Sequence, residues 1–336
     1  MPDSQLFLVM NAVGDSLGVH CDYCHVKGVA DPKTGSDNWL WERDDKPQKL
    51  RAREMMKMVL DLNQTHFGGQ QAVTCYSCHR GGTSVERIVP LPPREFTTAG
   101  NGGKKSALPT AEQIINRYIA AVGGQDAGAK FKTTVLKGQI ERTRGRSGSF
   151  EITIKGADKY SDKLITPQGV TTRVINGTVG WVRSNDETLG FDKNNDQAIQ
   201  VSPAAVAGSK RALALYDAVK VTEQPPQMTV LGVEKIGDRE TYVVAVKVDP
   251  KVTRKYFFDA QTGLLSRAMT ITETVLSPLQ TQVDFEDYRD VDGVKLPFTI
   301  RTADVAAFDT TTRRFTEIRH NAAVDDALFE MPTNRK

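Results

Sequence analysis

The apolar positions of the chain follow two periodicities, and the change between them divides the sequence. Over residues 49–62 apolar residues recur at i, i+3, i+4 and i+7, which is the spacing of one face of a helix. These positions are Met55, Met58, Val59 and Leu62. Pro47 suits the first turn of such a helix, and Gly68 and Gly69 follow its predicted end. The first 82 residues are therefore predicted to be mainly helical.

A second helix is predicted to begin at Thr110, where Gln113 completes a candidate capping box, and to end at Gly123 and Gly124. Beyond it, short runs of alternating apolar and polar residues are separated by turn signals. One further helix is predicted over residues 204–219. The predicted strands are Thr134–Glu141, Phe150–Lys155, Thr171–Ile175, Gly180–Arg183, Met228–Val233, Thr241–Val248, Arg254–Phe258, Ser266–Thr274, Gln282–Tyr288 and Phe315–His320.

Many strands at near-regular spacing with few helices predict a curved antiparallel sheet, or half-barrel. Between the two patterns, residues 83–107 are rich in proline and glycine and poor in apolar residues, as expected at a domain boundary. We therefore expect an α+β multidomain protein with a mainly α domain over residues 1–82, a Pro/Gly-rich linker over 83–107 and a β-rich domain over 108–336. A length of 336 residues suits two domains.

Charge and hydropathy narrow the function classes only a little. The formal net charge is +3 and there is no dense run of Lys and Arg, so nucleic-acid binding is not expected. The sequence contains no run of about 18 apolar residues, the minimum for a membrane-spanning helix. The N-terminus also lacks the pattern of a signal peptide. We expect that a targeting segment is absent from this sequence.

Cysteine usage carries the strongest chemical signal. All four cysteines fall in two Cys-x-x-Cys-His motifs: Cys21, Cys24 and His25, then Cys75, Cys78 and His79. In this motif two thiols reach the two vinyl groups of one porphyrin, and the histidine binds the iron from one face. A zinc ribbon or a redox disulfide also uses paired cysteines, but neither requires a histidine after each second cysteine. The sequence therefore predicts two covalently bound haem c groups.

The second axial ligand of each iron is less sharply defined. The candidates are Met10 for the first haem, Met55, Met56 or Met58 for the second, and His20 and His66 as competitors. A methionine opposite histidine raises the reduction potential, as in electron carriers, although methionines on a helix face are more often part of a core. His20 adjoins Cys21 and is a poor ligand for its own haem, and His320 is expected to be structural or exposed.

Three arginines flank the predicted haem segments: Arg51, Arg53 and Arg80. Guanidinium groups pair with carboxylates in a bidentate manner and so suit haem propionates. A solvated helix face explains the same residues equally well.

The segments around the second motif resemble the cytochrome subunit of photosynthetic reaction centres. These segments are RAREMMKM at 51–58, LN at 62–63 and VTCYSCHRG at 73–81. In that family the first methionine of the helix is an axial ligand, which the resemblance carries onto Met55. The segment around the first motif resembles the family less closely, and the resemblance implies Met10 as the axial ligand there. Relative to the family, the spacing from Met10 to Cys21 is slightly short and the segment over 27–45 is expanded. The family subunit carries four haems and this sequence provides motifs for two, so docking to a reaction centre is not carried over.

The second domain is similar in pattern to the half-barrel of periplasmic lipoprotein carriers. The similarity rests on one N-terminal helix over 110–122, on long strands and on the segments 257–265 and 287–297. A concave sheet of this kind suits an acyl chain, another subunit, or presentation of the cytochrome, and fold alone does not choose among them.

These observations favour a periplasmic or extracellular electron-transfer protein with redox proteins as partners. One alternative is a subunit of a polymeric, electron-conducting assembly, which would make the chain a homo-oligomer or filament. Another is a haem-dependent reductase or peroxidase with one open haem. The sequence favours an electron carrier over an enzyme. A lipid bound in the half-barrel is kept as a further candidate partner.

Overall fold

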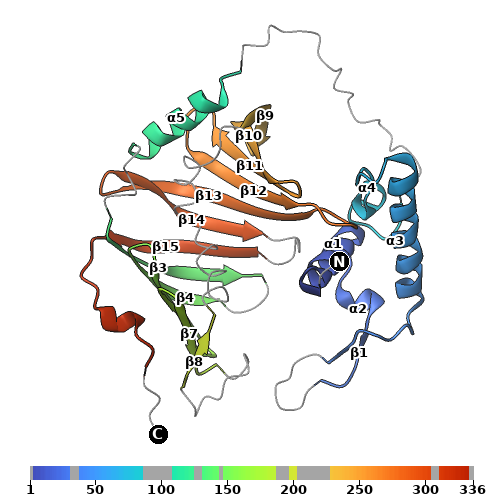
Figure 1. Cartoon of the computed structure of the whole chain (residues 1–336), viewed down its shortest axis with the longest axis horizontal. Coiled ribbons are helices and arrows are strands. Elements are labelled where there is room, and N and C mark those ends of the chain that lie inside the picture. The colour runs from blue at the N-terminus through green and yellow to red at the C-terminus, as the bar shows by residue number, and fades with distance from the viewer. Residues whose placement is uncertain are drawn as a thin grey trace.

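The computed structural model describes residues 3–30, 38–85, 108–124, 131–143, 147–186, 197–202, 228–303 and 310–332. The helix predicted over 204–219 and most of the predicted linker lie outside these residues. In the described part of the chain, helices occupy the N-terminal segment and strands most of the remainder (Figure 1). None of the helices in these ranges has the length and apolarity needed to cross a membrane.

In the described part of residues 3–85, which we call the helical region, there are four helices and one pair of short antiparallel strands. They are α1 (Asp3–Leu17), α2 (Cys21–Cys24), β1 (Val26–Lys27), β2 (Trp39–Leu40), α3 (Pro47–His66) and α4 (Cys75–His79). Pro47 stands in the first turn of α3 as predicted. Beyond the end of α3, Gly68 and Gly69 have positive φ angles of 60° and 79°, and the Gly69 amide donates to the Asn63 carbonyl at 3.0 Å. The predicted start and end of this helix are confirmed.

The strands after residue 130 form one antiparallel sheet of 13 strands, the sheet region (Figure 1). Its order is β8-β7-β6-β5-β4-β3-β15-β14-β13-β12-β11-β10-β9. Strands adjacent in sequence therefore pair, apart from β8 and β9, which lie at the two edges, and the first and last strands, β3 and β15, pair with each other. The strands are β3 (Thr133–Arg142), β4 (Gly148–Lys155), β5 (Lys159–Thr166), β6 (Gly169–Asn176), β7 (Val179–Ser184), β8 (Ala198–Val201), β9 (Thr229–Ile236), β10 (Arg239–Asp249), β11 (Val252–Asp259), β12 (Leu265–Thr272), β13 (Leu279–Val291), β14 (Val294–Ala303) and β15 (Thr310–His320).

The predicted large curved antiparallel sheet is thus confirmed, but three strands were missed. The β5 sequence contains Asp162 and two lysines, so its apolar pattern is weak. The β14 strand contains Pro297, which disfavours a strand assignment from sequence. The β8 strand has only 4 residues. Pairing with neighbours on the sheet, rather than local sequence preference, stabilises these three strands.

Helix α5 (Ala111–Val122) covers part of one face of the sheet and completes the main core. Its capping box forms as predicted, because the Thr110 hydroxyl accepts from the Gln113 amide at 3.2 Å and the Gln113 side chain accepts from the Thr110 amide at 2.9 Å. The buried side chains Ile114, Tyr118 and Val122 of α5 belong to the same apolar cluster as the sheet residues beneath them. This cluster is the largest core among the described residues.

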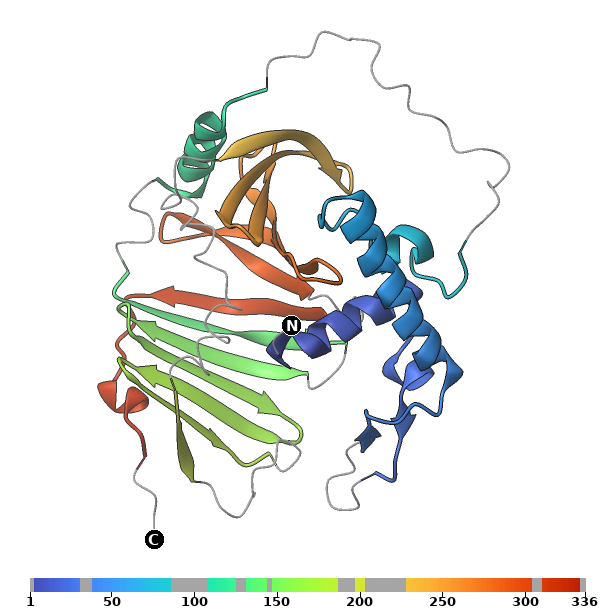
Figure 2. The ribbon, with the colours of Figure 1, turned by 45° about the vertical axis from the view of Figure 1, so that its right-hand side comes forward.

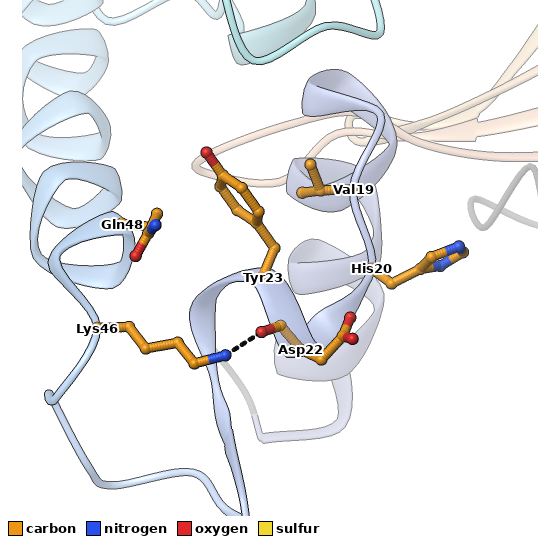
Figure 3. Close-up of a pocket in the computed structure, with 6 residues that line it drawn as sticks. All are labelled: Val19, His20, Asp22, Tyr23, Lys46 and Gln48. Carbon is orange, nitrogen blue, oxygen red and sulfur yellow. Dashed lines mark hydrogen bonds between the residues drawn. The ribbon is translucent and has the colours of Figure 1, made fainter.

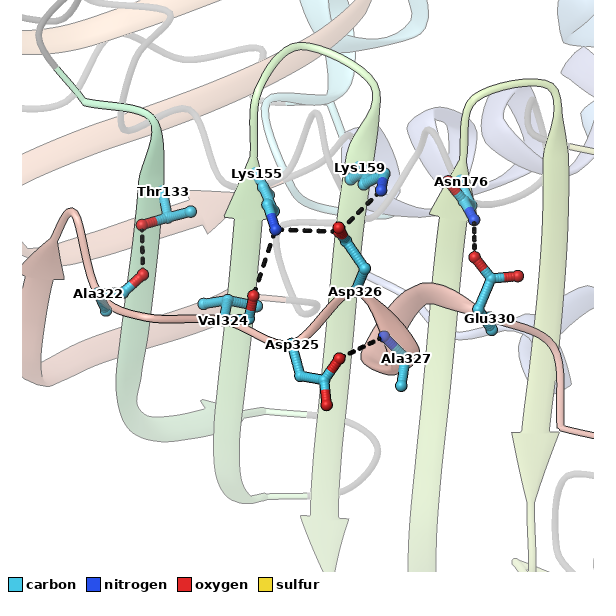
Figure 4. Close-up of polar contacts among 10 residues, drawn as sticks. All are labelled: Thr133, Lys155, Lys159, Asn176, Ala322, Val324, Asp325, Asp326, Ala327 and Glu330. Carbon is cyan, nitrogen blue, oxygen red and sulfur yellow. Dashed lines mark hydrogen bonds and ion pairs between the residues drawn. The ribbon is translucent and has the colours of Figure 1, made fainter.

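The opposite face of the sheet is covered by the C-terminal segment (Figure 4). Residues 322–331 run across β4 to β7, and the short 3-10 helix η3 (Asp326–Phe329) inserts the fully buried Phe329 against Val174 and Trp181. Lys155 and Lys159 bind the Asp326 carboxylate at 3.0 and 2.8 Å. We call residues 322–331 the C-terminal strap.

Helix α1 of the helical region lies beside the sheet region (Figure 2). A small apolar cluster joins the two regions there. Val9 and Ala12 of α1 pack with Leu276 and Leu279, at the turn between β12 and β13. Met10 and Met56 lie at the margin of this cluster. The site of contact is therefore at α1 and α3, the helices that precede the two cysteine motifs.

Candidate haem sites

The first motif forms a single helical turn. Helix α2 contains both Cys21 and Cys24, and the His25 amide closes the turn on the Cys21 carbonyl at 2.8 Å. His25 then takes an extended conformation with φ −107° and ψ 153°, which starts the short strand β1. One turn followed by extended backbone keeps the two thiols and the imidazole together, as a c-type haem requires.

A mainly apolar cavity of about 460 Å³ lies beside this turn. Both cysteines, His25 and Met10 line it, so the structure brings together four of the residues predicted for the first haem. The other lining residues come from α1, from the segment after it, from the end of β2 and from α3: Leu6, Phe7, Asn11, Val13, Gly14, Asp15, Leu17, Val19, His20, Trp41, Lys49, Ala52, Arg53 and Met56. The lining thus holds two thiols, the imidazoles of His20 and His25 and the thioethers of Met10 and Met56 around an apolar space, and a methionine–histidine haem c site can be built from this set.

An aromatic cluster covers the His25 side of this cavity, and the sequence did not predict it. The Trp41 ring lies 5.0 Å from the His25 ring at an interplanar angle of 72°, and it stacks on Trp39 at 5.1 Å and 17°. Phe7 of α1 meets Trp41 edge-on at 5.4 Å. The two tryptophans stand at positions i and i+2 within the expanded segment, so strand alternation was the signal that could have placed them on one face.

Burial lowers the pKa of His25, and the positive charge of Lys49 lowers it further, while the nearby Trp41 backbone partly offsets this. A lowered pKa keeps the imidazole neutral, which is the form that binds a metal. Lys49 itself is buried, and its ammonium group donates to the carbonyls of Trp41 at 2.6 Å and Arg43 at 2.7 Å and pairs with Asp44 at 2.9 Å. Lys49 thereby fastens the segment after β2 to α3, a role that sequence analysis missed.

The arginine candidates differ in their surroundings. Arg53 lines the cavity and binds the Asp44 carboxylate, whose pKa is lowered by the hydrogen bonds from Arg53 and Lys49. Arg80 ends α4 in the left-handed region with φ 49°. Arg51 is exposed on α3. Of the three, Arg53 is the one that the structure places on the wall of the cavity.

The second motif is held by its flanking residues. Helix α4 begins with a capping box in which the Thr74 amide donates to the Ser77 hydroxyl at 3.0 Å. The buried side-chain amide of Asn63, on α3, makes two hydrogen bonds to the Val73 backbone at 2.7 and 2.9 Å. The His79 Nδ1 atom bonds the Gly82 carbonyl at 3.0 Å. With Nδ1 donating to a carbonyl, Nε2 carries the lone pair that an iron-ligating histidine needs.

The two motifs are joined by backbone contact. Helix α1, which precedes the first motif, packs against α4, and the Gly81 amide donates to the Ser16 carbonyl at 2.9 Å. Gly18 has a φ of 65°, and a Cβ atom at this position would collide with the Gly81 carbonyl. Gly18 thus allows the segment before the first motif to approach the segment after the second.

The candidate second ligands of the second haem all lie on α3. Met55 and His66 are eleven positions apart, which places them on the same face of the helix as Leu62. Met58, Leu62 and His66 line a shallow groove of about 460 Å³ whose lining residues all come from α3. Met56 faces the first cavity instead. The structure therefore separates Met56 from the other methionines, and Met55 and His66 stay predictions.

His20 lies beside a shallow open pocket of about 540 Å³, and its ring points away from Tyr23 and Lys46 (Figure 3). The Lys46 ammonium group donates to the Asp22 carbonyl and so ties α2 to the start of α3. His320 is nearly fully buried, stacks on Phe131 at 3.5 Å and bonds Asp292 at 3.1 Å, so it is structural.

A zinc site built from the paired cysteines does not match their arrangement in the structure. In the described ranges no group of three or more His, Cys, Asp or Glu side chains is close enough to share one metal ion. The four described cysteines form no disulfide with one another and do not converge on a single site. Burial raises the pKa values of Cys24 and Cys75.

Comparison with known proteins confirms the N-terminal resemblance. Residues 29–101 match the family described as the photosynthetic reaction centre cytochrome C subunit, a stretch that holds α3 and the second motif. The photosynthetic reaction center cytochrome c subunit of Rubrivivax gelatinosus is 30% identical over 112 residues, which are 33% of this chain and 23% of that protein. The chain thus spans about a quarter of the length of this relative.

Solved structures resemble the sheet region. A LolA superfamily protein from Nitrosomonas europaea is 16% identical, with a TM-score of 0.40 over 66% of this chain and 98% of its own. A DUF1329 family protein from Desulfovibrio piger is 13% identical, with a TM-score of 0.42 over 66% of this chain and 98% of its own. The likeness concerns the fold alone.

Proposed function

We propose that this chain is a periplasmic or extracellular electron-transfer protein that carries two haem c groups, one at each Cys-x-x-Cys-His motif. The observation that carries the proposal is the apolar cavity that Cys21, Cys24, His25 and Met10 line together. The family resemblance around the second motif supports the same chemistry for the second site. When bound, a haem c supplies a one-electron couple at its iron.

The residues of the chain have separable tasks in this proposal. The paired thiols would fix each haem by thioether bonds, and His25 and His79 would bind the irons from one side. The hydrogen bond from His79 to the Gly82 carbonyl would set the orientation of its ring. The apolar wall and the stacked tryptophans would exclude water from the first site and so keep its potential high.

Met10 and Met55 are the proposed second ligands, with His66 as the alternative to Met55. Met10 is supported by its position on the wall of the first cavity, and Met55 by its correspondence to the ligating methionine of the related family. Arg53 is proposed to reach a propionate of the first haem from its pairing with Asp44, and Arg80 one of the second. Redox proteins are the proposed partners.

Near-infrared magnetic circular dichroism of the oxidised protein, calibrated to its haem content, tests the proposal. We expect two haems per chain, both with the methionine–histidine signal. Met10→Ala and Met55→Ala should each remove about half of that signal, whereas the matched variant Met56→Ala should retain all of it, although Met56 lines the first cavity.

Three results would count against parts of the proposal. A haem content below two would refute the two-site assignment. A bis-histidine signal would move the second ligand from Met55 to His66. A high-spin signal in the unmodified protein, with carbon monoxide binding to its ferrous form, would replace the electron carrier with an enzyme that has an open haem.

A further inference from the structure

Lys49 carries a buried charge on the wall of the cavity beside the first motif. In the described part of residues 3–85, it is the one buried residue with a charged side chain. Burial of an ammonium group costs free energy, and a neutral side chain can also fasten the backbone. Asn63 shows this at the second motif, where its amide makes two hydrogen bonds to Val73. The charge of Lys49 therefore points to a task beyond fastening the chain.

The ammonium group of Lys49 is held in one position by all three of its donors. Two of them go to the carbonyls of Trp41 at 2.6 Å and Arg43 at 2.7 Å, and the third goes to the Asp44 carboxylate at 2.9 Å. Asp44 also binds Arg53, which lines the same cavity, and its side chain is 41% exposed. Because an exposed charge is screened more than a buried one, the cavity wall keeps a positive potential from Lys49.

This potential reaches the histidine of the first motif. Burial lowers the pKa of His25, and the charge of Lys49 lowers it further. Arg53 and Lys46 add smaller effects of the same sign. Since these charges disfavour a positive charge on the imidazole, they also disfavour an additional positive charge on an iron bound to it.

The two motif histidines differ in the hydrogen bond at Nδ1. His79 bonds the Gly82 carbonyl at 3.0 Å, whereas the buried Nδ1 atom of His25 forms no hydrogen bond to any described residue. The Trp41 backbone is near the His25 ring, but its carbonyl accepts from Lys49 at 2.6 Å. A hydrogen bond at Nδ1 makes a ligating imidazole more basic, and a more basic ligand stabilises ferric iron. His25 is therefore expected to stabilise ferric iron less than His79 does.

We propose that Lys49 raises the reduction potential of a haem at the first motif above that of a haem at the second. This inference rests on the proposed function, because it requires a haem at each motif. Oxidation of a haem iron adds one positive charge to its site, and a fixed buried cation opposes that change. By engaging the Trp41 carbonyl, Lys49 also withholds it from His25. Both effects raise the potential, and the described residues of the second site provide neither of them.

Spectroelectrochemical titration of the full-length holoprotein tests the proposal, with the haem content measured on the same sample. We expect two one-electron steps in the unmodified protein. In Lys49→Met, the equilibrium constant for the upper reduction step should fall by about tenfold, a shift of about 59 mV, while the lower step stays in place. Because Lys49 lines the first cavity, a shift of the upper step assigns the higher potential to the first haem.

Two further variants separate the charge of Lys49 from its role in holding the chain. Asp44→Asn removes the negative partner and should raise the equilibrium constant for the upper step by about twofold to fivefold, because this carboxylate is partly screened. Loosening of the segment would instead admit water and lower that constant. The matched control is Lys57→Met on the same helix, whose residue is 79% exposed and pairs with Asp61 at 2.7 Å. It should change both constants by less than about twofold.

An upper step that stays in place in Lys49→Met, or a shift confined to the lower step, would overturn the proposal. Failure of Asp44→Asn to raise the upper step would also overturn it, since the charges would then have no effect. If Lys49→Met fails to fold, Asp44→Asn retains the lysine, and the direction of its shift decides. A haem content below two in the unmodified protein would instead refute the proposed function itself, and with it this inference.

Discussion

The helical region and the sheet region bury their apolar residues in different ways. The sheet region closes a continuous core that includes the fully buried Tyr118, Phe258 and Phe285. The helical region has few fully buried apolar side chains among its described residues, and a mainly apolar cavity lies beside the first motif. We infer that the sheet is stable without a cofactor, whereas the helices depend on haem to complete their core.

The largest expected effect comes from preventing attachment of the second haem. In Cys75→Ala/Cys78→Ala the second haem cannot attach, so α4 and the segments packed on it should lose their structure while the sheet remains folded. Hydrogen exchange read by mass spectrometry should show fast exchange over residues 3–85 and unchanged exchange over 228–303. Tyr76→Phe, a change at an exposed position inside the same motif, is the matched control. Slow exchange in the helices of the double variant would contradict the inference.

The next effect tests the sheet region alone. Phe329→Ala empties a fully buried site between Val174 and Trp181 and should destabilise the sheet by about 3–5 kcal/mol. Denaturant unfolding followed by Trp181 fluorescence measures this change, since the indole also donates to the Phe329 carbonyl at 3.2 Å. Leu328→Ala, at a neighbouring exposed position, should change stability by less than about 1 kcal/mol. A shift in the haem spectra of Phe329→Ala would show that the two regions are more tightly coupled than expected.

A smaller effect belongs to the helical region. Gly18→Ala places a side chain in the left-handed region and against the Gly81 carbonyl, with an expected cost of about 3 kcal/mol. Gly68→Ala has a similar φ of 60° with nothing within 4 Å of its Cβ, so it should cost only about 1 kcal/mol. Thermal unfolding followed at the haem absorption band compares the two. Equal costs would mean that the contact between the two motifs contributes nothing to stability.

The smallest effect concerns pH and the C-terminal strap. Hydrogen bonds from Lys159 and Lys155 lower the pKa of Asp326 in the folded state. The ionised carboxylate is thus the form that stabilises the strap, so this contribution is present above the ordinary aspartate pKa of about 3.9 and is lost as the pH falls through the lowered value. A titration of Trp181 fluorescence from neutral to acid should show this step. Asp326→Asn should lack it, and a step of unchanged size in that variant would refute the assignment.

The sequence predicted the features of the fold that depend on local pattern. Alternation identified most strands, and the Thr110 capping box and Pro47 marked helix starts at the correct residues. It failed where pairing with neighbouring strands overrides composition, as at Asp162 in β5 and Pro297 in β14. The relation between the two regions was also beyond reach, because Val9 and Leu279 meet only through tertiary structure.

The candidate site likewise has parts that the sequence predicts and parts that only the fold creates. The cysteine motifs predict their chemistry through spacing alone, so both proposed attachment sites can be assigned from the sequence. The burial of Lys49 could not be predicted, because a lysine on a helix is usually solvated. Nothing nearby in the sequence indicates that its ammonium group donates to the Trp41 and Arg43 carbonyls.

The pairing of β3 with β15 affects how the chain folds during its synthesis. Arg314 and Glu141, which pair across these strands, are 173 residues apart, so the two halves of the sheet join only when the last strand has been synthesised. Contacts of such long sequence separation form slowly. Until β15 arrives, β3 presents an open edge that another copy can pair with. A chain truncated before residue 310 is therefore expected to aggregate through the unpaired edge of β3.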